Sequence, residues 1–184
     1  MSDDLIRRAR DGDPEAWREL YESLTGRLLV WLRARPSGDV AYDPDDLVSE
    51  TWLVAARSVA DFQGDRDAFA GWLFGIARNH ARAARRRTLR RATEPSTDEA
   101  HADSSDLSPG PDDHVVAHDR VRRLLASVPT REGEVLACTE VAGLSTRQTA
   151  DALGISAAAV RVARHRGLTR LRGMTEPVGV TTAR

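Results

Sequence analysis

The segment Gly143–Arg172 constrains the fold most strongly, because signals for two helices and the turn between them follow one another closely. Ser145 can cap a first helix, and Gln148 three residues later completes a capping box. Gly154 suits the turn, where glycine adopts a positive φ at low cost, and Ser156 can cap a second helix. A helix pair of this kind, with arginines on its second member, is typical of a helix-turn-helix that reads DNA. A helical hairpin with arginines on its solvent face is the alternative.

The residues inside this segment support the helix pair. Ala150 is small where two helices must cross closely, while Ile155 and Val160 are expected to face back toward Leu153. The side chains expected to face solvent on the second helix are Arg161, Arg164, His165 and Arg166. The sequence therefore predicts a basic outer face on the second helix.

Composition excludes several classes of protein. The chain has 184 residues, of which 41% are hydrophobic and 30% charged, as in a globular protein. It contains no apolar run that could span a bilayer and no opening signal sequence, so we expect it in the cytoplasm. Its one cysteine, Cys138, lies among apolar residues and is expected to be a buried structural thiol. His114 and His118 are spaced as a metal pair could be but have no evident partners, so neither a metal nor another cofactor is expected.

Charge is distributed in blocks along the chain. All 27 basic residues are arginine, and seven of them fall between Ala77 and Arg91 without one acid. The segment Ala92–Asp119 reverses this pattern, with eight acids and no arginine. Such blocks are typical of interaction surfaces, and arginine is well suited to forked contacts with phosphate.

The chain divides into two parts of different character. All the aromatic residues precede position 75, and a stretch rich in Ser, Pro and Asp follows the arginine block. That stretch cannot bury enough apolar surface to offset the entropy of ordering it. The sequence therefore predicts an all-α fold with two small helical domains, 1–91 and 114–173, joined by a flexible acidic linker, 92–113. A loose tail, 174–184, is expected to follow.

Helical periodicity and Asp-Pro start signals locate the elements, and no strand-like alternation is present. The predicted helices of the first domain are a short one around 5–9, then 14–35, 44–60 and 68–91. Those of the second domain are 115–127, 131–141, 145–153 and 156–172.

The predicted helix 44–60 has two distinct faces. The apolar stripe, expected to face inward, consists of Val48, Trp52, Ala55 and Val59. The opposite line is mainly acidic and includes an exposed leucine; it consists of Asp46, Glu50, Leu53 and Arg57. This line is a candidate protein interface, although a solvated face with a stray leucine is the alternative.

The predicted helix 68–91 is the second candidate surface. Its inward face is expected to hold Phe69, Leu73, Ile76, Ala77, His80 and Ala84, while Arg78, Arg82, Arg85 and Arg86 are expected to project outward. Arginines that reach phosphates make DNA binding strong and dependent on salt, and Asn79 suits a forked contact with adenine. The alternative is a solvated helix end whose cations suit the helix dipole.

Three motifs in this order resemble the sigma-70 family of RNA polymerase sigma factors, in its small extracytoplasmic-function group. DPDDLVSETWLVAAR looks like the family's helix that binds the clamp of the polymerase's largest subunit, and FAGWLFGIARNHARAARRR looks like the helix that reads and melts the minus-ten promoter element. VPTREGEVLACTEVAGLSTRQTADALGISAAAVRVARHRGLTRLR looks like the domain that reads the minus-thirty-five element. The resemblance covers roughly residues 3–172.

The resemblance also implies roles for individual residues. Those that would bind polymerase are Asp46, Leu47, Glu50 and Leu53. The loop that would hold a flipped base of the minus-ten element consists of Phe62, Gln63, Gly64, Asp65, Arg66 and Asp67, while Arg78, Asn79, Arg82 and Arg86 would grip the adjacent strand. The residues that would enter the major groove of the minus-thirty-five element are Ser156, Ala157, Arg161, Arg164 and His165. Val162 and Ala163 stand where the family usually has Ser and Arg, which leaves the base-reading residues of this helix open.

The implied function is that of a sigma factor that binds core RNA polymerase, recognises both promoter elements and promotes DNA opening. The chain pairs no nucleophile with a base, so no enzymatic activity is expected. The expected partners are core RNA polymerase, promoter DNA and an anti-sigma factor, with no direct insertion into a membrane. Two alternatives stay open: a stand-alone helix-turn-helix transcriptional regulator, which would not need the acidic helix, and a protein-interaction adaptor without DNA binding.

Overall fold

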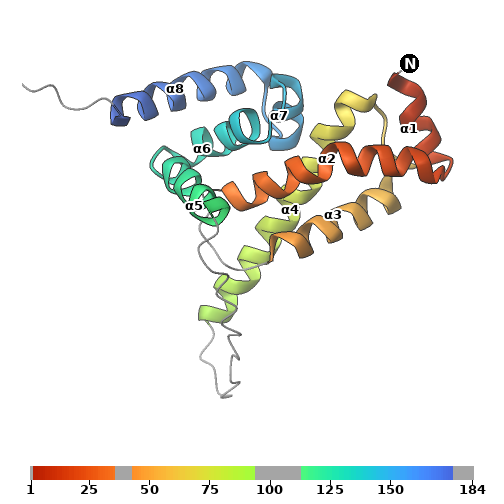
Figure 1. Ribbon diagram of the computed structural model, residues 1–184, viewed down its shortest axis with the longest axis horizontal. Coiled ribbons are helices and arrows are strands. Elements are labelled where there is room, and N and C mark those ends of the chain that lie inside the picture. The colour runs from red at the N-terminus through yellow and green to blue at the C-terminus, as the bar shows by residue number, and fades with distance from the viewer. Residues whose placement is uncertain (1, 36–42, 94–112, 176–184) are drawn as a thin grey trace, which may run out of the picture.

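The computed structural model describes residues 2–35, 43–93 and 113–175, and within these ranges every regular element is helical. The elements are α1 (Ser2–Arg10), α2 (Pro14–Ala34), α3 (Pro44–Ser58), α4 (Arg66–Thr93), α5 (Asp113–Ala126), α6 (Thr130–Leu136), the π-helical turn η1 (Ala137–Val141), α7 (Thr146–Leu153) and α8 (Ala157–Thr175) (Figure 1). The all-α prediction is confirmed. Most of the predicted linker and tail lies outside the described residues, and α4 extends two residues beyond the predicted domain end at 91.

Asp-Pro pairs start two of the long helices, as the sequence predicts. The side chains of Asp13 and Asp43 accept hydrogen bonds from the backbone N–H groups of Glu15 and Asp45, each at 2.9 Å. Proline follows each cap at the first helical position, where its missing N–H costs no intrahelical bond.

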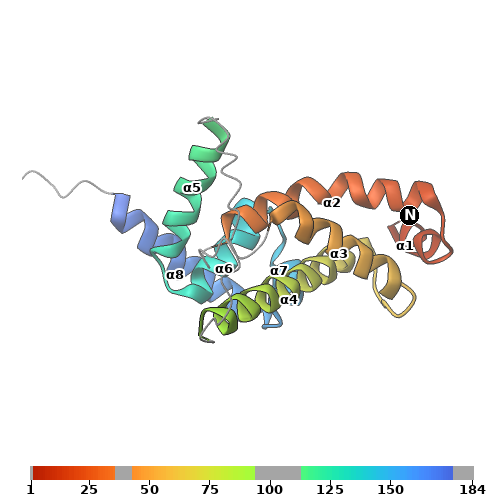
Figure 2. The ribbon, with the colours of Figure 1, turned by 90° about the horizontal axis from the view of Figure 1, so that it is seen from below.

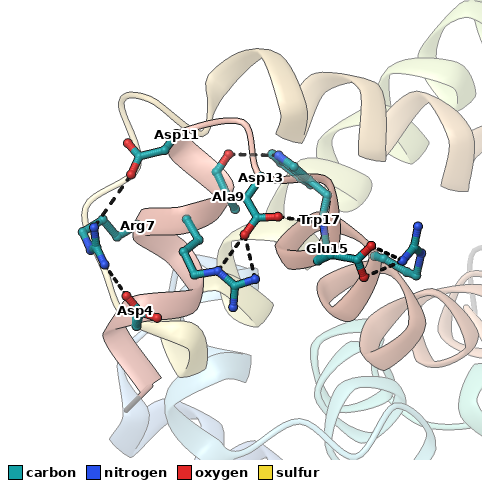
Figure 3. A network of polar contacts seen from close by, with 9 residues as sticks. Asp4, Arg7, Ala9, Asp11, Asp13, Glu15 and Trp17 are labelled. Carbon is teal, nitrogen blue, oxygen red and sulfur yellow. Dashed lines mark hydrogen bonds and ion pairs between the residues drawn. The ribbon is translucent and has the colours of Figure 1, made fainter.

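The junction of α1 and α2 is held by a polar network around the first of these caps (Figure 3). Arg8 Nε donates to Asp13 Oδ2 at 2.7 Å, while Trp17 Nε1 donates to the carbonyl of Ala9 at 2.9 Å. The hydrogen bond from Arg8, followed by that from the Glu15 amide, holds the pKa of the Asp13 carboxyl below its usual range. The ionised form of Asp13 therefore stabilises the fold.

Replacing Asp13 by asparagine should lower the thermal unfolding midpoint at neutral pH. Asn still caps α2 but cannot form the ion pair with Arg8, whereas Asp13→Ala loses both and should be lower still. Because the pKa of Asp13 is lowered on folding, its contribution is present above the ordinary pKa of aspartate and disappears as pH falls through the lowered value. Circular dichroism melts should show the gap between wild type and Asp13→Asn closing in acid. The exposed Asp61→Asn is the control, and a gap that persists in strong acid would contradict the assignment.

The first four helices share an aromatic core. Rings from α2, α3, α4 and the loop before α4 pack with centroids 4.8 to 6.5 Å apart, half of them edge to face and half tilted; the rings are those of Trp17, Trp52, Phe62, Phe69 and Trp72. The predicted inward stripe of α3 is buried as expected. We call α1–α4 the N-terminal helical group.

The remaining elements, α5–α8 with η1, form the C-terminal helical group and contain the predicted helix-turn-helix. Ser145 and Gln148 form the reciprocal capping box at the start of α7, and Gly154 ends that helix with φ at +63°. Ser156 Oγ accepts from the Ala159 amide at 3.1 Å, and Val160 is fully buried. These sequence predictions are confirmed.

The predicted helix 131–141 is interrupted. It continues from α6 into the π-helical turn η1, where the Ala142 amide donates to the carbonyl of Ala137 at 3.0 Å. This turn contains Cys138, which is buried as expected, and burial raises the pKa of its thiol to about 12. The thiol therefore stays protonated at neutral pH.

The cores of the two groups touch. Their buried residues form a single cluster, because α7 packs along α4 while η1 and α5 pack on α2 (Figure 2). Trp31 lies at this junction, with its ring 5.2 Å from that of Phe74 and beside Cys138. The two groups do differ in core character, since the aromatic residues belong to the first, but they are joined by packing as well as by the chain.

Candidate interface for polymerase and nucleic acid

The outer face of α3 carries the predicted polymerase contacts. Asp46, Glu50 and Leu53 are exposed along it, and the side chain of Leu53 is 51% exposed. Leu47, grouped with them in the sequence, is only 3% exposed. It therefore packs in the core behind this face and supports the helix from inside.

Tyr21 of α2 is an exposed aromatic residue that contacts α3, and the sequence did not predict its exposure. The ring of Tyr21 lies 5.2 Å from that of Trp52 and Tyr21 is half exposed. In the sequence Tyr21 fits the helical period of the core residues around it, so only the structure shows its exposed edge. Leu53 thus adds apolar surface to the acidic face of α3, and Tyr21 adds apolar surface on α2 beside Trp52.

A hydrogen bond joins the two predicted binding helices. His80 Nδ1 of α4 lies 3.2 Å from Glu50 Oε2 of α3. His80, predicted to pack inward, is half-buried, so its ring reaches the acidic line from the apolar side of α4. A protonated imidazole would make this contact an ion pair.

The loop before α4 and its first turn hold the residues predicted to bind a flipped base. Phe62 is buried against Phe69 and Trp72, and Gly64 approaches it so closely that a Cβ at Gly64 would lie 2.7 Å from the Phe62 ring. Gln63 is exposed. Asp65 caps α4 by accepting from the Ala68 amide at 2.7 Å. Phe62 therefore anchors the loop to the aromatic core, and Asp65 joins it to α4.

The charged residues of this first turn border a cavity of about 350 Å³ between α2, α4 and α7. Arg66 pairs with Glu19 of α2 at 2.5 Å, and Asp67 Oδ1 accepts from Gln148 Nε2 of α7 at 2.7 Å. The C-terminal helical group therefore reaches the loop that the sequence predicts to bind a base.

The arginines of α4 divide into two sets. Arg82, Arg85 and Arg86 are exposed as predicted, and the neighbouring Asn79 is exposed as well. The outward projection of Arg78 is wrong, because α7 covers this part of α4 and leaves the side chain only 14% exposed. Its Nη1 donates to the carbonyl of Leu153 at 3.0 Å.

The exposed stripe of α8 differs in part from the predicted one. It runs at helical spacing through Ala158, Arg161, Val162 and His165. Val162 is 50% exposed and was not predicted as a contact. Arg164 instead reaches back to η1, where its Nε donates to Glu140 Oε1 at 2.6 Å; this bond, above all, lowers the pKa of Glu140. Of the other predicted contacts, Ser156 caps the helix and Ala157 is half-buried.

Comparison with known proteins places both groups in one family. A model described as Sigma-70 region 2 matches residues 20–91, and one described as Sigma-70, region 4 matches residues 118–171. The ECF RNA polymerase sigma factor SigD of Mycobacterium tuberculosis is 32% identical over 176 residues, which cover 92% of this chain and 82% of SigD. The ECF RNA polymerase sigma factor ShbA of Streptomyces griseus is 29% identical over 180 residues, covering 94% of each chain.

The fold also matches a solved structure. CnrH, determined in complex with the cytosolic domain of CnrY, superimposes with a TM-score of 0.68 at 22% identity, covering 94% of this chain and 96% of CnrH. None of the helices in the described parts of this chain is both long and apolar enough to cross a membrane.

Proposed function

This chain belongs to the extracytoplasmic-function group of the sigma-70 family of RNA polymerase sigma factors, and from that membership we propose which surfaces perform each step. It is a promoter-recognising sigma factor. The observation that carries this conclusion is the presence of both family regions, in order, on two helical groups that bear exposed acidic and basic faces. Sigma factors act as initiation factors, and we propose that this one has no catalytic activity of its own.

We assign docking on core polymerase to the outer face of α3. Asp46 and Glu50 supply negative charge, Leu53 supplies apolar surface, and Tyr21 extends that surface onto α2. An apolar residue ringed by charge is typical of an interface with a buried centre and a polar rim. Leu47 contributes by fixing the helix from inside.

Contacts with the minus-ten element are assigned to α4 and the loop before it. Arg82, Arg86 and Asn79 are exposed donors that suit the phosphates and base edges of one strand. The residues assigned to hold a flipped base are Phe62, Gln63, Gly64, Asp65, Arg66 and Asp67, with Phe62 and Gly64 shaping the loop. Arg78 is assigned to the same set from the family resemblance, although α7 covers it in this structure.

Contacts with the minus-thirty-five element are assigned to the exposed stripe of α8. Arg161 and His165 supply hydrogen bond donors, while Val162 supplies an apolar surface of the kind that contacts thymine methyl groups. The N-terminal turn around Ser156 and Ala157 would approach the DNA backbone. Arg164 contributes by bracing α8 against Glu140.

We also propose that the chain is controlled by an anti-sigma factor. CnrH, which shares its fold, was determined in complex with the cytosolic domain of another protein, CnrY. A binder of this kind would find the acidic face of α3 and the basic face of α4 together on the N-terminal helical group.

Transcription in vitro tests the function directly. Core RNA polymerase supplemented with this chain should start RNA synthesis at discrete sites on genomic fragments from the source organism, whereas core enzyme alone should not. DNA binding without polymerase, and no transcription, would favour a stand-alone regulator. Binding of neither DNA nor polymerase would favour an adaptor.

Deoxyuridine substitution should identify the thymine that Val162 contacts. Uracil lacks the methyl group, so replacing that one thymine should weaken binding of the upstream element by about fourfold, the value of roughly one buried methylene. Val162→Ala should remove this sensitivity. Arg161→Ala should weaken binding by about 1–3 kcal/mol yet keep the sensitivity, which makes it the matched control. Equal binding of all uracil-containing elements by wild type would contradict the role of Val162.

A further inference from the structure

Helix α1 packs on α4 and contacts the loop that leads into it (Figure 1). Its inner face is apolar, since Leu5, Ile6 and Ala9 are all buried. The match to Sigma-70 region 2 begins at residue 20, so α1 lies outside the part of the chain that the family model covers. What α1 contributes to DNA recognition is therefore set by its own contacts.

One side chain of α1 reaches the loop assigned to the flipped base, residues 62–67. Arg10 is the last residue of α1, and its Nη2 donates to the carbonyl oxygen of Phe62, 52 residues further along the chain. Because Phe62 lies in a loop and not in a helix, its carbonyl depends on a donor such as this one. A charged donor makes the hydrogen bond stronger than one between neutral groups.

The end of α1 that carries Arg10 is itself held in place. On one side of Arg10, the carbonyl of Ala9 accepts from Trp17 Nε1 at 2.9 Å; on the other, Asp13 Oδ2 accepts from Arg8 Nε at 2.7 Å (Figure 3). The backbone from which Arg10 extends is thus ordered by the start of α2. The bond to Phe62 therefore requires little further loss of backbone entropy.

The bond from Arg10 fixes a whole peptide unit of the loop. The carbonyl of Phe62 and the N–H of Gln63 belong to one planar trans peptide, so the N–H points away from Arg10 when the carbonyl points toward it. On its other side Phe62 is anchored by its ring, which lies 4.8 Å from Trp72 and 5.6 Å from Phe69. With both the ring and the carbonyl of Phe62 held, the exposed Gln63 leaves the loop in a defined direction.

The rest of the loop follows Phe62 closely. A Cβ at Gly64 would lie 2.7 Å from the Phe62 ring and 2.9 Å from the Cβ of Ala68, so the chain folds back tightly onto both. Asp65 then caps α4 by accepting from the Ala68 amide. A displacement of Phe62 would therefore be passed on to the residues that follow it.

We propose that Arg10 is a positioning residue for recognition of the minus-ten element. By holding the Phe62 carbonyl it sets the direction of Gln63 and the shape of the loop, and so the loop's selectivity for the flipped base. This role rests on the proposed assignment of residues 62–67 to that base. A recognition site must be held to within about 0.5 Å, so loss of Arg10 should weaken recognition of that base in particular. A phosphate contact would instead support binding of every sequence equally.

Binding of single-stranded DNA by the holoenzyme tests the role of Arg10. The probes are fluorescein-labelled oligodeoxynucleotides that carry the non-template minus-ten strand of a promoter mapped by transcription in vitro, intact or with one base at a time replaced by an abasic site. Wild type should lose most affinity at one position, the flipped base. Arg10→Ala should bind the intact probe about tenfold more weakly, the value of one hydrogen bond from a charged donor, yet bind the probe that lacks this base as wild type does.

Arg7→Ala is the matched control, because it removes an arginine from the same helix that pairs with Asp4 and Asp11. It should bind every probe as wild type does, and circular dichroism confirms that both variants fold. An equal loss by Arg10→Ala on all probes, including the abasic ones, would show a role in stability or phosphate binding and overturn the proposal. Unchanged binding of the intact probe would overturn it as well.

Gly64→Ala separates this proposal from the assignment on which it depends. The added Cβ displaces the loop through the Phe62 ring without touching Arg10, so it should produce the same loss, confined to the flipped base. If Gly64→Ala shows this loss and Arg10→Ala does not, the loop keeps its assignment and the role of Arg10 fails. If neither variant changes the response to any single base, the assignment of the loop fails, and the role of Arg10 fails with it.

Discussion

Replacing Asp46 and Leu53 together by arginine is expected to abolish binding of core RNA polymerase while the helical content of the chain stays the same. Both side chains are exposed on α3, so neither replacement disturbs the core. Each adds a positive charge to a face that otherwise presents carboxylates, and Leu53→Arg also removes the apolar centre. If each side chain is worth about 2 kcal/mol, as central interface residues are, the Kd should rise roughly several-hundredfold.

Surface plasmon resonance with immobilised core polymerase measures this loss. The matched control is Asp11→Arg with Leu124→Arg, which makes the same chemical changes at exposed positions outside α3, in the turn after α1 and in α5. The control should bind as wild type does. Unchanged affinity of the Asp46 and Leu53 double variant would remove polymerase docking from α3, whatever the outcome of the DNA experiments.

The largest effect on stability is expected from Trp31→Ala, which should lower the free energy of unfolding by about 3–5 kcal/mol. The Trp31 side chain is 2% exposed, its ring packs against Phe74, and the Arg35 guanidinium lies 4.9 Å from the ring centroid. The substitution leaves a cavity at the place where the cores of the two helical groups meet. A loss of this size is a large part of the roughly 5–15 kcal/mol that stabilises a typical domain.

Urea denaturation followed by circular dichroism measures this change. Leu124→Ala, at a position that is 41% exposed on α5, should shift the unfolding free energy far less, by about 0.5 kcal/mol. Since Trp31 belongs to a core shared by both groups, the variant should also weaken the contact between them and increase the radius of gyration. A loss below about 1 kcal/mol would show that the two cores are not coupled through Trp31.

Local signals along the chain were sufficient for most of the fold. The Asp-Pro pairs at Asp13 and Asp43 specify helix starts because the carboxylate and the proline act within one turn. Likewise Ser145, Gln148 and Gly154 specify the helix-turn-helix through bonds and backbone angles between near neighbours. Helical periodicity also assigned α3 its buried stripe and its acidic outer face, since every third or fourth side chain lies on one side of a helix.

The candidate site was predicted less completely, because several of its residues depend on contacts between distant parts of the chain. Periodicity placed Arg78 on an outer face, but α7, which lies 75 residues further along at Leu153, covers that face. The sequence around Glu134 did not predict its ion pairs, because its three arginine partners lie far away in the chain, at the end of α2 and in α4. Arg164 was predicted to face solvent, but it pairs with Glu140 of η1, which lies 24 residues earlier in the chain.

The amino-acid sequence alone was thus enough to specify the helices, their caps, the turn between α7 and α8 and the division into an aromatic and an aliphatic part. These features depend on interactions within a few residues, which a single chain displays directly. Packing of α7 on α4 was needed to decide that Arg78 is covered, and packing of α7, η1 and α5 on the first group decided how the two cores meet. Those outcomes follow from close contact between surfaces that are far apart in the chain, and no local pattern encodes them.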